Sequence, residues 1–364
     1  MTEQKHIVII GGGPAGLQAA SGLKDSGHQI TIIEKESTIG GKLNSWHKLF
    51  PEFQTANDIS VYLINSINNS NTEVLKQTIV TKITRENNHF KISTAQNHSL
   101  KADAILLATG FELFRAEKKE EYGYGIYKNI ITSADLESSF RQNGLKDLLL
   151  GKTHPRIGFI HCVGSRDKKC GNTYCSKVCC VTGVKQAIEI KQLIPHSQVF
   201  NFYMDLRMYG QNFEELYIEA QQDYSINFIR GRVSEIAENI DGTLQIKAED
   251  TLSGRPLKMN FDLVILLAGM ENRQDYDNIM DNNIKLSRSN GFIVPINRHV
   301  RPNETTIPGI FIAGTCREPL SIQETIADAI LDRIVHDSYM IEINVDPEED
   351  SMRELHGIRK NKQD

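Results

Sequence analysis

Long hydrophobic runs, an excess of basic residues and the spacing Cys-x-x-Cys are all missing from this sequence of 364 residues. No stretch approaches the roughly 18 consecutive apolar residues of a membrane-spanning helix, so we expect no membrane span. The formal net charge of −5 argues against a nucleic-acid-binding protein, because a phosphate backbone is held mainly by lysine and arginine. The apolar run at the N-terminus is too short for a signal peptide, which predicts a cytoplasmic protein in a reducing compartment.

The length of the chain is more than one compact core normally holds, and it predicts two domains. The composition, 40% hydrophobic and 24% charged, is that of an ordinary globular protein. Residues 346–364 are charged and almost free of large apolar side chains. We therefore expect a mobile C-terminal tail there.

A glycine-rich turn follows the first predicted strand, in the stretch HIVIIGGGPAGLQAASGL. Gly11, Gly13 and Gly16 have the spacing Gly-x-Gly-x-x-Gly, with Pro14 and Ala15 between the last two. In a dinucleotide-binding unit the first glycine allows the tight turn and the second lets the backbone approach a pyrophosphate. The third lets the helix pack close to the strand, so that its N-terminus faces the phosphates.

The next strand, QITIIEK, ends in Glu34 and Lys35, and a carboxylate at this point accepts hydrogen bonds from a ribose. Three later stretches favour FAD over NAD: Gly40-Gly41-Lys42, LLATG at 106–110, and GIFIAGT at 309–315. The further candidate cofactor-binding residues are therefore Gly41, Lys42, Ala108, Thr109, Gly110, Gly314 and Thr315.

Together these stretches resemble the FAD domain of the two-dinucleotide-binding-domain flavoproteins, which include thioredoxin reductase and glutathione reductase. In that family an aspartate usually follows the last glycine and binds the ribityl chain. Here Thr315 stands in its place, so we expect a hydroxyl or backbone contact. Cys316 comes next and is expected to be a small buried residue near the flavin rather than a redox group.

The resemblance implies an α/β fold with two Rossmann-like domains, the second inserted into the first. We expect an FAD-binding domain over 1–150 and 286–345, with the inserted domain over 151–285. The strand RIGFIHC and a helix over about 177–194 would begin the inserted domain. A nicotinamide-binding domain has Gly-x-Gly-x-x-Gly between these two elements, and VGSRDKKCGNTYCS lacks that spacing. We therefore expect no NAD(P)H at the usual place.

Five of the six cysteines lie in this region instead. Cys175 and Cys179 are four residues apart and would share one helix face, while Cys162 ends the preceding strand. Iron–sulfur clusters take four thiolates, and the helix N-terminus and nearby basic residues would favour an anionic cluster. A zinc site or a redox dithiol would usually contain Cys-x-x-Cys, and inert core cysteines would be scattered; these three alternatives stay open.

The motif CVGSRD…YCSKVCC resembles the A subunit of heterodisulfide reductase and its bacterial relatives. The stretches GGKLNSWHKLFPEF, MDLRMYGQNFEELY and GTCREPLSIQETIADA agree, so the resemblance covers about residues 5–335. It implies FAD in the first domain and a [4Fe-4S] cluster in the second. The implied cluster ligands are Cys162, Cys175, Cys179 and Cys180, whereas Cys170 has no clear counterpart.

The resemblance also implies an oxidoreductase subunit that passes electrons between a flavin and partner iron–sulfur subunits, in thiol/disulfide or sulfur metabolism. The expected partners are heterodisulfide-reductase-like B and C subunits, with ferredoxin or another electron donor and a second copy of this chain as further candidates. Larger family members contain Cys-x-x-Cys-x-x-Cys-x-x-x-Cys modules that this chain lacks.

Two alternatives are a self-contained NAD(P)H-dependent disulfide reductase and a non-catalytic flavin and zinc scaffold. No catalytic residue is assigned, although the imidazoles of His47 and His161 are candidates for proton transfer.

Overall fold

The fold is taken from a computed structural model, which describes residues 4–68, 70–149, 151–272 and 276–330. The tail expected at 346–364 lies outside these residues. No helix in the described ranges has the length and hydropathy of a membrane-spanning segment.

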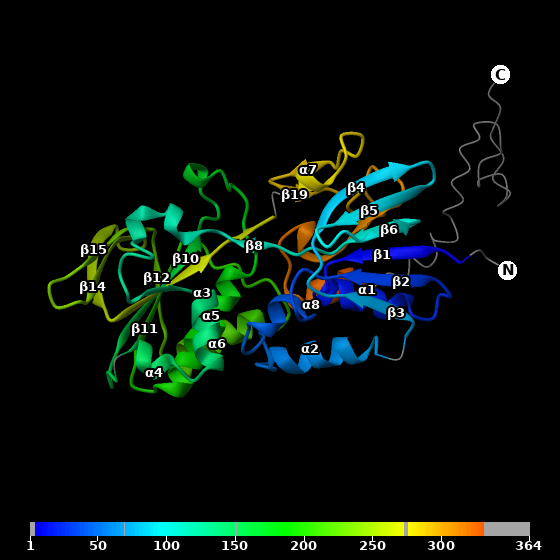
Figure 1. The fold of residues 1–364 in the computed structure, drawn as a ribbon. Helices are drawn as coiled ribbons and strands as arrows, with labels where there is room; N and C mark the ends of the chain where they lie inside the picture. The colour runs from blue at the N-terminus through cyan, green and yellow to red at the C-terminus, as the bar shows by residue number, and fades with distance from the viewer. Residues whose placement is uncertain (1–3, 69, 150, 273–275, 331–364) are drawn as a thin grey trace, which may run out of the picture. The chain divides into compact units, whose positions relative to one another are not determined.

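The first sheet has five parallel strands in the order β20-β7-β1-β2-β3 (Figure 1). Its central strand is apolar and buried from Ile7 to Ile10, which is typical of a parallel strand that is covered on both faces. Helix α1 packs beside α2 and α8. These elements are β1 (His6–Ile10), α1 (Pro14–Leu23), β2 (Gln29–Ile33), α2 (Ala56–Asn65), β3 (Thr72–Leu75), β7 (Ala104–Leu107), β20 (Ile310–Ile312) and α8 (Ile322–Asp328).

The second sheet also has five parallel strands, in the order β12-β11-β10-β16-β9. Helices α3, α5 and α6 cover one face through a buried apolar cluster that includes Leu136, Val184 and Leu216. The elements are β9 (Ile130–Thr132), α3 (Ser133–Arg141), α4 (Leu145–Leu148), β10 (Arg156–Val163), α5 (Cys179–Leu193), β11 (Gln198–Tyr203), α6 (Phe213–Gln222), β12 (Asn227–Arg230) and β16 (Leu263–Ala268).

An antiparallel three-stranded sheet covers the other face of the second sheet, so that this part of the chain has three layers (Figure 1). Phe261 of the small sheet stacks edge-on against Phe200 and Phe202 of β11. The small sheet consists of β13 (Val233–Glu238), β14 (Leu244–Asp250) and β15 (Arg255–Phe261).

Three further small sheets complete the described part of the fold. Strands β8 (Glu112–Leu113) and β17 (Met270–Glu271) form an antiparallel pair where the chain leaves the first sheet and where it returns from the second. The others are β4 (Val80–Glu86), β5 (His89–Thr94) and β6 (Ser99–Ala102), and β18 (Arg288–Ser289) with β19 (Phe292–Ile293); α7 (Tyr276–Ile279) lies beside β4.

The chain order confirms the expected fold class, since first-sheet strands at 6–107 and 310–312 flank the second-sheet strands at 130–268. The structure differs from the expected start of the inserted domain at 151, because β9 pairs with β16 of the second sheet. Three residues, Ile130–Thr132, are too few to predict from the sequence which sheet this strand joins. Helix α3 begins directly after it, with a capping box between Thr132 and Asp135.

Candidate functional site

The glycine turn after β1 has no room for a side chain at Gly11 or Gly16. Gly11 has a φ of +112°, and a Cβ there would lie 2.3 Å from the carbonyl oxygen of Ala108. A Cβ at Gly16 would lie 1.9 Å from the carbonyl oxygen of Gly11, so the helix packs directly on the turn. A Cβ at Gly13 would have no neighbour nearer than 3.9 Å, at the Cα of Gly41. The two glycine stretches therefore face each other with the open space that a pyrophosphate approach needs.

Glu34 is held at the end of β2 by this turn. Its carboxylate is buried and accepts hydrogen bonds from the backbone N–H groups of Gly12, at 2.8 Å, and Glu36, at 2.9 Å. Those donors fix the carboxylate beside the glycine turn. This is the position from which an acidic residue contacts a ribose in a dinucleotide-binding unit.

A cavity of about 460 Å³ opens over the turn. Every cofactor-binding residue expected from the sequence lines it except Gly16 and Gly314, which lie beneath its wall. Burial lowers the pKa of Lys42, whose ammonium group lies 4.8 Å from the ring centre of Phe111. A volume of this size, a glycine cradle, a buried carboxylate and a lysine fit a dinucleotide cofactor.

A second cavity of about 160 Å³ shares part of the wall of the first. The shared residues are Trp46, Phe111, Leu113, Leu320 and Ile322. They come from separate segments of the chain, and no sequence spacing identified them. At the start of α5, Val178 and Cys179 line the second cavity, which therefore extends from the dinucleotide cavity to the cysteine region.

The four cysteines expected as ligands lie within electrostatic reach of one another. Burial raises the pKa of Cys162 to about 12, and the thiolate charges of Cys180 and Cys175 raise it too. Burial also raises the pKa of Cys179 well above its usual value, followed by the charges of the other three thiolates. Burial and the neighbouring negative charges therefore favour the protonated form of Cys162 and Cys179 unless a cation lies between the thiols.

The local backbone conformation determines where these thiol side chains lie. Cys162 lies at an irregularity of β10 and has a φ of +59°, which is rare for a residue with a side chain. Cys179 and Cys180 are the first two residues of α5. The backbone N–H of Lys177 donates to Cys175 Sγ at 3.3 Å. Such irregular backbone is typical of functional sites.

The surroundings of the thiols suit an anionic metal cluster. Arg166 Nη2 donates to Asp205 Oδ2 at 2.7 Å, whereas its Nη1 is buried and has no hydrogen-bond partner in the part of the chain that the structure describes. The Arg166 charge favours the thiolate form of Cys162. Four thiols of this kind are the donor set of iron–sulfur clusters and of zinc.

No three His, Cys, Asp or Glu side chains among the described residues are arranged around a single metal ion. A single ion must contact all its ligands at once, whereas each iron of a four-iron cluster holds one cysteine. Cys170 packs against the apolar cluster on the small-sheet side of the second sheet, whereas Cys179 belongs to the cluster on the other side. Burial raises its pKa, followed by the charge of Asp167.

Salt bridges anchor the loop after β10, which stands where a nicotinamide-binding domain has its glycine turn. Asp167 is 3% exposed and contacts Lys119 Nζ at 2.9 Å and Arg232 Nη2 at 2.8 Å. Asn172 and Asp167 also form an isolated backbone bridge. These contacts hold the loop in one conformation.

Comparisons with known proteins agree with this geometry. The model of the family "Pyridine nucleotide-disulphide oxidoreductase" matches residues 5–147. The A subunit of the H(2):CoB-CoM heterodisulfide,ferredoxin reductase of Methanothermobacter marburgensis is 28% identical, over 88% of this chain and 62% of the relative. One of the iron-sulfur A subunits of the CoB--CoM heterodisulfide reductase of Methanopyrus kandleri is 30% identical, also over 88% and 62%.

Over most of its length the chain is similar to heterodisulfide reductase A subunits. It spans about three fifths of the length of these curated relatives. Among solved structures, thioredoxin reductase of Lactococcus lactis has a TM-score of 0.65 at 19% identity and covers 93% of this chain and 98% of its own. That of T. acidophilum has a TM-score of 0.63 at 17% identity, covering 93% and 100%. These two share the fold.

The remaining candidate residues differ in their surroundings. Cys316 is fully buried, with its sulfur 3.1 Å from the carbonyl oxygen of Leu107, and it does not line the dinucleotide cavity. Burial raises its pKa to about 12. His161 is buried with Nε2 2.9 Å from Asn201 Oδ1, and burial lowers its pKa to about 4. His47 belongs to a network of charged groups.

Sequence reasoning missed this network and one residue at the last glycine turn. Asp328 accepts a hydrogen bond from the backbone N–H of Gly314 at 2.7 Å and contacts Arg317 Nη2 at 2.7 Å. A carboxylate therefore lies beside this turn, although it does not follow Gly314 in sequence. No motif spacing points to it.

Proposed function

We propose that this chain is an FAD- and [4Fe-4S]-containing electron-transfer subunit of a heterodisulfide-reductase-like complex. The observation that carries the proposal is the shared wall of the two cavities. The glycine turn lines one cavity, and the other reaches Cys179. A flavin and a cluster held at these two places would be separated by the second cavity and the mainly apolar side chains of the shared wall.

In the proposed complex, FAD supplies the conversion between two-electron and one-electron transfer. Glu34 would hold a ribose of the cofactor, and Lys42 would neutralise part of its negative charge. The apolar residues of the shared wall would exclude water from the reacting end. The candidates for the remaining FAD contacts are Gly11, Gly13, Pro14, Ala15, Lys35, Gly41, Ala108, Thr109, Gly110 and Thr315.

Cys162, Cys175, Cys179 and Cys180 would bind the cluster as thiolates. The raised pKa values of Cys162, Cys179 and Cys180 mean that a metal must displace the protons, so assembly would release protons. Arg166 would then direct its buried Nη1 toward the anionic cluster, which would supply the missing acceptor. Hydrogen bonds of this kind tune the potential of iron–sulfur centres.

The proposed partners are B and C iron–sulfur subunits, with ferredoxin or another donor as an electron source. The relatives are named for reduction of the CoB-CoM heterodisulfide, and one of them also for ferredoxin. We propose a disulfide or another sulfur species as the final acceptor, held on a partner. The loop after β10 lacks the glycine spacing for NAD(P)H and is fixed by Asp167, which argues against direct reduction by a nicotinamide.

Metal and flavin analysis of anaerobically purified protein tests the proposal. We expect about four iron and four sulfide per FAD, with an electron paramagnetic resonance signal after reduction. Cys175→Ala should lose this iron, whereas Cys170→Ala, the matched control, should keep it. If the protein contains flavin alone, anaerobic reconstitution must restore four iron in the wild type and not in Cys175→Ala.

Two results would contradict the proposal. Zinc at one per chain, with no iron taken up on reconstitution, would indicate a flavin and zinc scaffold. Stoichiometric reduction of the flavin by NADPH alone would instead indicate a self-contained disulfide reductase.

A further inference from the structure

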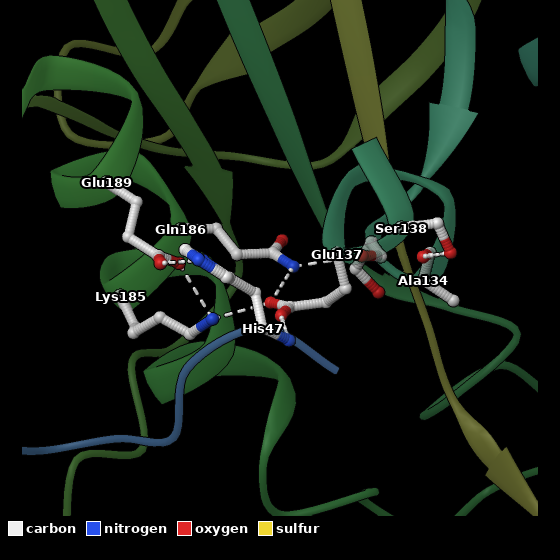
Figure 2. A network of polar contacts seen from close by, with 8 residues as sticks. His47, Ala134, Glu137, Ser138, Lys185, Gln186 and Glu189 are labelled. Carbon is white, nitrogen blue, oxygen red and sulfur yellow. Dashed lines mark hydrogen bonds and ion pairs between the residues drawn. The ribbon is translucent and has the colours of Figure 1, made fainter. Parts of the chain in front are cut away.

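A buried network of charged side chains borders the second cavity (Figure 2). Lys185 Nζ of α5 contacts Glu137 Oε1 of α3 at 2.5 Å and Glu189 Oε2 at 2.8 Å. Gln186 Nε2 donates to Glu137 Oε1 at 2.7 Å. Of these residues, Glu137, Lys185 and Gln186 line the cavity.

The imidazole ring of His47 is the member of this network that is in contact with solvent. His47 Nδ1 lies 2.9 Å from Glu189 Oε1, so the two oxygens of one carboxylate contact His47 and Lys185 separately. The side chain of His47 is 31% exposed, whereas those of Glu189 and Lys185 are 3% and 2% exposed. An unbroken row of hydrogen bonds therefore connects solvent with a buried ammonium group at the cavity wall (Figure 2).

With a neutral His47, this network has one more negatively charged group than positively charged groups. Two carboxylates face one ammonium group, and a protonated His47 would balance the remaining negative charge. The other charged residues that line the cavity are Lys48 and Glu52, one of each sign. From α3 the ring of Phe140 packs against His47, and the backbone N–H of His47 donates to Glu137 Oε2 at 2.8 Å.

We propose that His47, Glu189 and Lys185 form a proton path from solvent to the second cavity, used when the flavin of the proposed function is reduced. The inference rests on that proposed function. Lys185 has three ammonium hydrogens, and Glu137 and Glu189 accept two of them. Lys185 lines the second cavity, which shares a wall with the flavin cavity, so the third hydrogen would go to a basic atom of the flavin at that wall.

Each step moves one proton. An Nζ–H bond of Lys185 breaks, the proton passes to the acceptor in the cavity, and the electron pair stays on Nζ. The Nδ1–H bond of a protonated His47 then breaks, and Glu189 Oε1 takes that proton. Rotation of the carboxyl group brings the proton to Nζ. Nε2 of His47 still carries its hydrogen, so a flip of the partly exposed ring turns the bare Nδ1 to solvent, where it takes a proton from a solvent acid, and the reverse flip restores its contact with Glu189. Iron–sulfur donors supply the electrons and are oxidised by one electron each, so charge and protons balance.

Flash photoreduction of the flavin-loaded protein tests the path, with a photoexcited deazaflavin as the one-electron donor. The absorbance phase that reports flavin protonation should slow at least about tenfold in His47→Gln, as expected when a positioned acid–base group is lost. Added imidazole should restore the rate, because it can replace a missing ring at a half-exposed position. His196→Gln is the matched control and should behave as the wild type.

A second variant distinguishes the path from a structural role. Glu189→Gln should slow the same phase without rescue by imidazole, since the missing link is then buried. In the cofactor-free protein, the ring nitrogen resonances of His47 should shift in Glu189→Gln and stay unchanged in His196→Gln. This readout does not depend on flavin chemistry.

An unchanged protonation rate in His47→Gln would overturn the inference, and so would a slowed rate that imidazole does not restore. The flavin and iron content reports separately on the proposed function. A protein that binds flavin and cluster but protonates normally in His47→Gln keeps the proposed function and loses the path. A protein that binds no flavin loses both.

Discussion

Replacing Lys185 by methionine tests whether the buried network is a set of interdependent charges. Methionine has a comparable length and no charge, so Glu137 and Glu189 would remain buried without their ammonium partner, originally at 2.5 and 2.8 Å. Removing one partner of a buried ion pair costs about 3–5 kcal/mol. We expect a loss in this range rather than twice as much, because Gln186 and His47 still contact the two carboxylates.

Equilibrium urea unfolding measures this loss. With an m-value of about 3 kcal/mol/M, a loss of 3–5 kcal/mol lowers the midpoint by about 1–2 M. Lys191→Met is the matched control on the same helix, because Lys191 Nζ contacts only the carbonyl oxygens of Pro195 and Ser197 among the residues that the structure describes. Its midpoint should fall by less than about 0.5 M, as expected for ordinary hydrogen bonds.

A loss of stability below about 1 kcal/mol in Lys185→Met would refute the reasoning, because leaving buried carboxylates without a partner costs more than that. Adding Glu137→Gln and Glu189→Gln to Lys185→Met separates charge from packing. If uncompensated charge causes the loss, the triple variant should regain part of the stability. If the methionine simply packs badly, the triple variant should be no more stable than the single one.

Three further predictions follow from other parts of the fold. Basic partners lower the pKa of Asp167 although burial opposes them, so its stabilisation is present above the unfolded-state pKa and is lost as pH falls through the folded-state value. Asp167→Asn should therefore be less stable than the wild type at pH 7, with the difference in urea midpoint shrinking below about pH 4. The buried thiol of Cys316 should resist maleimide at pH 8 in the native protein, whereas the partly exposed thiol of Cys170 should react, as mass spectrometry of labelled peptides would show; equal labelling would contradict the burial. Gly16→Ala should weaken flavin binding at least about tenfold in a fluorescence titration, because its Cβ would lie 1.9 Å from the carbonyl oxygen of Gly11; unchanged affinity would mean that the turn tolerates the shift.

The glycine turn could be predicted because its parts are contiguous. The strand, the turn, the helix start and Glu34 lie within one short stretch, so their order in the sequence fixes their order in space. The cysteine region was conspicuous for a similar reason, since five cysteines fall near one strand end and one helix start. In both cases, local chain geometry brings the side chains together without help from distant contacts.

The wall between the cavities could not be predicted in the same way. Trp46, Phe111 and Leu320 are single apolar residues from separate segments, and they meet only because the tertiary fold brings those segments together. Strand β9 is a similar case, because its partner β16 lies more than 130 residues away in sequence. Pairing at that separation depends on the whole sheet and leaves no periodic pattern.

Helix α5 explains why the charged network was missed and why it matters. Lys185 and Glu189 are four residues apart, which in a sequence is typical of a solvent-exposed helix face, yet α5 is buried on the second sheet and packs against both α3 and α6. The same helix begins with Cys179 and Cys180. Lys185 lies six positions after Cys179, which is about 9 Å along a helix axis. One rigid element therefore sets the spacing between the thiol cluster and the ammonium group, so a shift of α5 would change the environment of both.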